Sequence, residues 1–276
     1  PNLTCFSWIQ YSTLPGFPSQ VRSLLQRMVA LERLTLYLLV DCADVFRDPL
    51  DIIEQLTGDM SQLHSLDFYA CAENTLARPS RSSFSSEAQQ HDKGKRCGQV
   101  CDAVGRSISS TFHHAFTLPF QFTRLTHIGR QFPENRFQHV VDLWIDDVEF
   151  DHELLLRVAR CFPALQGLLV REHLSVMQCT LDDPQTIRHQ QIAQFPRVKT
   201  LHVLMAGVRC IEQFLNENIT HLPQLAKLTV MDHHLRIVTH DFTRQDTRHN
   251  CAHVTELESC GTTAASKDYH DYFPSL

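Results

Sequence analysis

Histidine and cysteine are the side chains of this sequence that could bind a metal ion or act as nucleophiles, since the chain holds 17 histidines and 10 cysteines. The densest groups are His113-His114, His233-His234 and His249-x-x-x-His253, the last of which encloses Cys251. A structural zinc site needs one Cys or His pair matched by a second at suitable spacing. Cys97-x-x-x-Cys101 could supply a pair, but it borders a polar stretch that we predict to be disordered. We therefore predict no metal site and no cofactor.

Catalytic motifs are also lacking in the sequence. It contains no G-x-S-x-G, no P-loop, no dinucleotide fingerprint and no H-E-x-x-H, and its nine glycines leave little for phosphate-binding loops. A Cys/His nucleophile stays open, because its members need only be close in space, but no cysteine stands out. We predict that the protein is not an enzyme, and we keep a Cys/His or zinc enzyme as the alternative.

The elements that would position any site come from a repeat. Phe195-Pro-Arg-Val-Lys-Thr-Leu-His-Val203 is echoed by Leu222-Pro-Gln-Leu-Ala-Lys-Leu-Thr-Val230, and both read apolar-Pro-x-Φ-x-x-Leu-x-Φ, where Φ is aliphatic. Between them, Val208–Leu215 has helical spacing of apolar residues. Strand, helix and strand at a fixed period are typical of a solenoid.

Further copies of this pattern run through most of the chain. Their first Φ positions are residues 3, 31, 63, 140, 165, 198, 225, 254 and 276, and outside one interruption these lie 22 to 33 residues apart. We predict an α/β fold: a leucine-rich-repeat-like solenoid, or horseshoe, over residues 1–276, with parallel strands on the concave face and helices on the convex face. The alternative is an ordinary α/β domain with parallel strands. Because Pro1 and Leu276 both fall inside copies, we expect truncation at both ends.

The interruption is Glu73–Gly98, which is rich in Ser, Arg, Gln and Lys and has almost no aliphatic residues. This composition predicts a disordered insertion. After it we expect strands near Gln99–Val104 and Ala115–Phe120, and a helix over Phe122–Phe132. Before it, Asp48-Pro49 predicts the start of a helix that Gly58 ends.

Strand residues that point away from the core would line the concave face, and strand alternation identifies them. The partner-binding residues predicted in this way are Arg33, Tyr37, Asp67, Tyr69, Asp142, Trp144, Asp146, Arg171 and His202. Trp144 lies between Leu143 and Ile145, so we expect it to be exposed, as a binding hot spot would be. The alternative is that Trp144 only packs under a loop.

Composition narrows the class of partner and compartment. The formal net charge of −6 gives no general attraction to nucleic acid. No run approaches the 18 apolar residues of a membrane-spanning helix. The scattered cysteines form no regular disulfide framework, so we predict reduced thiols in the cytoplasm or nucleus. We predict binding to a protein substrate, with no nucleic acid and no membrane.

Four segments carry a resemblance to a known family: Met28–Leu38, Met60–Tyr69, Phe116–Gly129 and Val208–Val238. The chain resembles the repeat region of F-box/leucine-rich-repeat-like proteins. The resemblance implies the substrate-binding region of a Skp–cullin–F-box ubiquitin ligase, in which an F-box outside this chain would bind the Skp-type adaptor and, through it, the cullin. The Leu-Pro-x-Glu opening of an F-box is absent here. The alternative is a leucine-rich-repeat scaffold or adaptor unconnected with ubiquitin.

Overall fold

The computed structural model describes residues 3–13, 17–41, 48–74, 89–92, 98–106, 110–146, 150–172, 191–260 and 267–276. The fold is α/β and divides into two compact units. Unit 1 comprises residues 1–122 and 127–133, and unit 2 comprises residues 123–126 and 134–276. No helix in the described part of the chain is long and apolar enough to cross a membrane.

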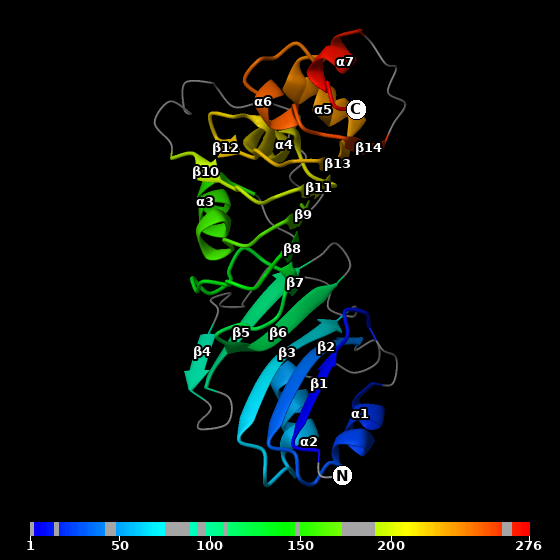
Figure 1. The fold of residues 1–276 in the computed structure, drawn as a ribbon, viewed down its shortest axis with the longest axis vertical. Coiled ribbons are helices and arrows are strands. Elements are labelled where there is room, and N and C mark those ends of the chain that lie inside the picture. The colour runs from blue at the N-terminus through cyan, green and yellow to red at the C-terminus, as the bar shows by residue number, and fades with distance from the viewer. Residues whose placement is uncertain are drawn as a thin grey trace. The chain divides into compact units, whose positions relative to one another are not determined.

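Unit 1 is built on a mixed sheet. Its strands, in the spatial order β1-β2-β3-β6-β5-β4, are β1 (Cys5–Ile9), β2 (Arg33–Asp41), β3 (Ser65–Asn74), β6 (Thr111–Leu118), β5 (Gln99–Arg106) and β4 (Gln89–Asp92). The first three run parallel, whereas β6, β5 and β4 follow in antiparallel pairs. Helices α1 (Phe17–Leu25) and α2 (Pro49–Thr57) connect the parallel strands, and Figure 1 shows α2 behind them.

Helix α2 begins and ends where the sequence predicts. The carboxylate of Asp48 accepts a hydrogen bond from the Leu50 amide at 2.8 Å, Pro49 occupies the first turn, and Gly58 is the C-cap. Ile53 and Leu56 are buried, in the same core cluster as Leu34 and Leu66 of the sheet. The predicted helix is confirmed.

Unit 2 is built on a second six-stranded sheet. Its spatial order is β14-β13-β11-β9-β8-β7, with β7 at Arg124–Ile128, β8 at Asp142–Asp146, β9 at Gly167–Arg171, β11 at Thr200–Leu204, β13 at Lys227–Met231 and β14 at Glu256–Cys260. The pairs from β8 to β14 are parallel. The helices are α3 (His152–Cys161), α4 (Val208–Leu215), α5 (Asp232–Thr239), α6 (Arg248–Cys251) and α7 (Lys267–Tyr272), and β10 (Ala193–Gln194) pairs with β12 (Thr220–His221).

The repeated sequence pattern has a shared geometry. In seven copies the amide of the first Φ residue donates to the carbonyl three residues earlier, at 3.1–3.4 Å; the donors are Leu31, Leu63, Leu165, Val198, Leu225, Val254 and Leu276. In four of these turns the second residue is proline, which favours that position because its φ is already fixed near the required value. The Pro of the repeat is therefore a turn residue that introduces a strand.

A second hydrogen-bond pattern joins successive strands. A carbonyl just before or at the start of one strand accepts two consecutive amides from the segment leading into the next, at 2.7–3.1 Å; the acceptors are Thr4, Glu32, Thr123, Val141, Gln166, Lys199 and Ala226. Because the same residue of each copy is used, the strands align in register. Leu143, Leu168, Leu201 and Leu228 consequently form one buried row across four strands.

The start of α4 is stabilised from outside the helix. Gly207, its N-cap, makes no side-chain capping bond. Instead the buried carboxylate of Glu172 accepts the Gly207 amide at 2.7 Å with one oxygen and the Phe150 amide at 3.0 Å with the other. A negative charge at a helix N-terminus is favourable. Glu172, which directly follows β9, therefore stabilises the start of α4 and links it to the end of that strand.

Of the predictions about the middle of the chain, the helix is wrong and the two strands are confirmed. Phe122–Phe132 is not a helix, because it contains strand β7, whose Leu125, Thr126 and Ile128 are buried. The strands predicted near 99–104 and 115–120 exist, as β5 and β6, but they form an antiparallel pair rather than continuing the parallel order. Within the predicted insertion, residues 73–74 end β3 and Gln89–Asp92 forms β4; residues 75–88 and 93–97 lie outside the described residues.

Candidate binding face of unit 2

Alternate residues of the parallel strands in unit 2 form a face that is only partly buried, which we call the outer face. It consists of two rows of register partners: Asp142, Gly167, Thr200, Lys227 and Glu256 in the first, and Trp144, Leu169, His202, Thr229 and Glu258 in the second. Strands β9 and β11 alternate between half-buried and buried residues along their whole length, and β8 does so from Asp142 to Ile145. The alternation expected for a sheet with one covered face is therefore present.

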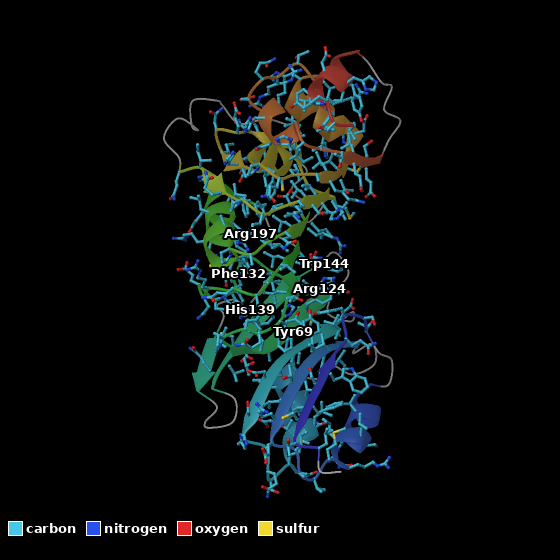
Figure 2. All side chains as sticks on the ribbon, viewed as in Figure 1. Tyr69, Arg124, Phe132, His139, Trp144 and Arg197 are labelled. Atoms are coloured by element: carbon cyan, nitrogen blue, oxygen red, sulfur yellow. The ribbon has the colours of Figure 1, made fainter. Side chains whose placement is uncertain are left out.

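A hollow of about 300 Å³ lies on the outer face. Its lining comprises Arg124, Asp142, Trp144, Gln166, Gly167, Leu168, Leu169, Lys199, Thr200 and His202. Figure 2 labels Trp144 and Arg124, which come from the neighbouring strands β8 and β7. The hollow combines an indole, an aliphatic side chain, two cations, a carboxylate and an imidazole.

Gly167 creates the gap between the first-row side chains. Its neighbours across the sheet are Asp142 and Thr200, and a Cβ atom at position 167 would come within 2.6 Å of the Asp142 Oδ1. That separation is shorter than any ordinary contact, so a side chain here would displace the Asp142 carboxylate. The absence of a side chain at Gly167 leaves the floor between Asp142 and Thr200 open.

One ion pair lies at the β7–β8 end of the hollow. The Arg124 guanidinium contacts the Asp142 carboxylate at 3.3 Å, and each side chain is about one third exposed. Partly exposed pairs of this kind contribute at most about 1 kcal/mol to stability. The pair therefore neutralises both charges and fixes the position of the Asp142 carboxylate more than it stabilises the fold.

A chain of polar contacts extends from His202 to the edge strand. Its Nδ1 lies 2.8 Å from the Thr229 hydroxyl, which donates to the Glu258 carboxylate at 3.0 Å. The Lys227 ammonium in turn donates to Glu258 at 2.6 Å and contacts Glu256 at 3.3 Å. The hydrogen bond from Lys227 lowers the pKa of Glu258, so this carboxylate is ionised and acts only as an acceptor.

These contacts determine the tautomer of His202. The Thr229 hydroxyl has a single proton and gives it to Glu258, so the 2.8 Å contact with His202 requires a proton on Nδ1. Burial lowers the pKa of His202, with an opposing contribution from the Glu258 charge. The neutral ring consequently carries its lone pair on Nε2.

The hollow brings together three of the predicted partner-binding residues: Asp142, Trp144 and His202. Trp144 is half-buried, as a contact residue on an open face would be. Arg171 is on the same sheet and half-buried, but its guanidinium lies 3.8 Å from the carboxylate of Asp146. The prediction that Asp146 is exposed is wrong: the residue is completely buried.

The other four predicted residues belong to unit 1, and two of them are not on an open surface. Arg33 is exposed and Asp67 half-buried, and burial raises the pKa of the Asp67 carboxyl. Tyr37 and Tyr69 are completely buried and stack on each other at 4.5 Å between ring centroids. Phe122 packs on Tyr37 and Phe120 on Tyr69, because the segment after β6 covers this part of the sheet. The expected exposure of both tyrosines is wrong.

Sequence reasoning missed Arg124, Gly167 and Lys199. Arg124 was hidden by the incorrect helix over Phe122–Phe132. Gly167 did carry a signal, since a glycine within a strand often marks a close approach or an open space. Lys199 immediately precedes β11 and follows the first Φ residue of the repeat pattern. The pattern allows any residue at this position, so the sequence alone does not predict which way the side chain points.

The candidate metal residues are dispersed in the structure. Among the described residues no group of three or more His, Cys, Asp or Glu side chains is placed to hold a metal ion. His114 is buried and bonded to Tyr69, His249 stacks on His221, and Cys251 is buried. Cys97 lies outside the described residues.

Comparisons with known proteins give no relative: no family model, no curated protein and no solved structure matches the chain.

Proposed function

We propose that this chain is a protein-recognition module that binds a partner protein through the outer face of unit 2. The observation that carries the proposal is the half-buried Trp144, which lines a hollow together with Leu169 and His202. Tryptophan contributes more binding energy at interfaces than most residues, particularly where other side chains surround it. The proposed role is non-catalytic.

The proposed architecture is a leucine-rich-repeat-like solenoid with the outer face on its concave side. The support comes from the seven turns with the same hydrogen bond and from the seven carbonyls that each accept two amides. In a solenoid, stacked copies of one sequence repeat bury a continuous core and leave one long face for a partner. The alternative architecture is an ordinary α/β domain, which also accommodates parallel strands.

The resemblance to F-box/leucine-rich-repeat-like proteins leads to a narrower proposal: the bound protein is a substrate of a Skp–cullin–F-box ubiquitin ligase. Such a protein would contact the Skp-type adaptor and the cullin through an F-box outside this chain. Cysteines with free thiols among the described residues, such as Cys161 and Cys210, support a reducing compartment, the cytoplasm or nucleus. A scaffold or adaptor without a ubiquitin connection is the alternative.

The test is affinity capture of the full-length protein followed by mass spectrometry and titration of the recovered partner. Trp144→Ala is expected to leave the melting temperature nearly unchanged and to weaken binding by more than ~1 kcal/mol, as hot-spot residues do. Trp8→Ala is the matched control, because Trp8 lies on β1 in unit 1. Unchanged affinity in Trp144→Ala would reject the outer face as the binding surface.

Recovery of a cullin and its adaptor with the wild-type protein would support the ligase proposal. A different stable partner, recovered without them, would support the scaffold alternative. Bound metal, or one cysteine with unusual alkylation reactivity, would instead favour an enzyme.

A further inference from the structure

The side chains that line the hollow carry more positive than negative charge. Of its ionisable residues, Arg124 and Asp142 neutralise each other at 3.3 Å, and burial favours the neutral form of His202. Lys199 is exposed and makes no ion pair within the described part of the chain. The acidic residues Glu256 and Glu258 lie on β14 and do not line the hollow; Lys227 contacts both and balances one of their two negative charges. Among the described residues, the hollow therefore presents one uncompensated cation, Lys199.

The same hollow presents an apolar surface and a hydrogen-bond acceptor. Trp144 and Leu169 are register partners on adjacent strands, so their side chains are neighbours on one face. Leu169 is in turn the partner of His202, whose Nε2 lone pair is the acceptor left by the contact with Thr229. The lining of this one hollow can thus take an apolar group, an N–H donor and an anion.

The volume limits what the hollow can hold. About 300 Å³ is at the lower end of the range for small-molecule sites. It accommodates one or two side chains, whereas a nucleotide or similar cofactor needs more enclosure. Since the hollow lies on a sheet face and not in an enclosed cavity, its occupant must extend beyond it along the face.

We propose that the outer face binds an acidic, apolar peptide segment of the partner protein. An apolar side chain of the segment packs between Trp144 and Leu169, an Asp or Glu carboxylate pairs with Lys199, and an N–H of the segment donates to Nε2 of His202. The proposal rests on the proposed function and specifies the chemistry that the outer face recognises. Charge complementarity of this kind determines partner choice and association rate more than the total affinity.

The experiment is a fluorescence-anisotropy titration of the full chain with labelled, terminally blocked peptides at physiological salt. The probes are an Asp-Leu-Asp-Phe-Asp peptide, the same peptide with Lys in place of Asp, and an all-Asp peptide without apolar residues. The expected order places the acidic apolar peptide first, with the basic and the purely acidic peptides each weaker by about tenfold or more. Equal binding of the acidic and basic apolar peptides would overturn the proposal.

The variants separate the hollow from general surface charge. Lys199→Glu is expected to weaken the acidic peptide by about tenfold or more and to strengthen the basic one. Arg197→Glu makes the same charge change at an exposed position two residues away that does not line the hollow, and it should have a much smaller effect. Equal losses in the two variants would show a diffuse charge effect and would overturn the site.

A third variant tests the shape of the hollow. Gly167→Ala adds a methyl group against the Asp142 carboxylate and fills the gap, so it should weaken the acidic peptide without changing the net charge. Circular dichroism would confirm that the variant is folded. If no probe peptide binds and the Trp144-dependent capture of a whole protein persists, the acidic-peptide proposal fails and the recognition function stands.

Discussion

His114 is a single side chain whose protonation is coupled to the folding of unit 1. Its Nε2 lies 3.0 Å from the His127 carbonyl, which can only accept, so Nε2 carries the proton and Nδ1 accepts from the Tyr69 hydroxyl at 3.0 Å. Burial lowers the pKa of His114 to about 3, and the hydrogen bond to the carbonyl only partly offsets this. The folded structure therefore requires the neutral ring.

The predicted consequence is a loss of stability in mild acid. Between pH 6.5 and about 3 the unfolded chain binds a proton at His114 that the folded chain does not. The stabilisation is thus fully present above pH 6.5, and it decreases by up to about 1.4 kcal/mol for each pH unit below that value. Urea unfolding of a Trp144→Phe background at several pH values would measure it, because Trp8 in unit 1 is then the only tryptophan.

The comparison for this prediction is His114→Gln, which cannot titrate but can still donate and accept. Its unfolding free energy should depend less steeply on pH between 6.5 and 4 than that of the parent. His64→Gln, at an exposed histidine of the same unit, is the matched control. Parallel slopes in all three proteins would show that His114 is not the titrating group.

One buried row of leucines runs across the strands of unit 2. Leu201 and Leu228 are register partners on β11 and β13, and both are completely buried. We predict that Leu201→Ala and Leu228→Ala each reduce the free energy of unfolding by roughly 2–5 kcal/mol, since each leaves a cavity that the parallel strands cannot close. Denaturant titration followed by circular dichroism would measure the loss.

Leu169→Ala is the matched control for these variants. It removes the same atoms from β9, but its side chain is half-buried on the outer face, so the loss of stability should be clearly smaller. A cost near zero at both Leu201 and Leu228 would contradict the assignment of this row to the core.

On the scale of the whole molecule, the division between the units passes through a strand. Residues 123–126, which include the start of β7, belong to unit 2, whereas residues 127–133 belong to unit 1. Within unit 2 the Thr123 carbonyl accepts the amides of Val141 and Asp142 at 2.7 and 3.1 Å. Strand β7 is therefore the next member of the same hydrogen-bond series that joins β8 to β9.

We predict that a fragment of residues 123–276 melts at a higher temperature than one of residues 134–276. The shorter fragment lacks the Thr123 carbonyl, the buried Leu125 and the Arg124 partner of Asp142, so β8 becomes an exposed edge. Thermal melting followed by circular dichroism would compare them. Identical melting temperatures would mean that β7 contributes nothing to unit 2.

The sequence alone determined the local elements of this protein. The Pro of the repeat indicates a turn because its φ is fixed, and period-two alternation after it identifies the core leucines, as Leu201 and Leu228 confirm. Asp48-Pro49 likewise predicts the start of α2, because a cap acts on amides only two residues away. Each of these signals depends on neighbours in the chain.

Tertiary structure alone decided which outward positions stay accessible and which way strands run. The period-two pattern gives Tyr37, Tyr69 and Trp144 comparable positions in their strands, but Phe120 and Phe122 cover the two tyrosines, whereas Trp144 is half-buried. The same pattern is identical for parallel and antiparallel neighbours, so it did not predict the β5–β6 pair. Which side chains are covered, and whether neighbouring strands run parallel or antiparallel, results from contacts between segments far apart in the chain. Local residue spacing does not encode these contacts.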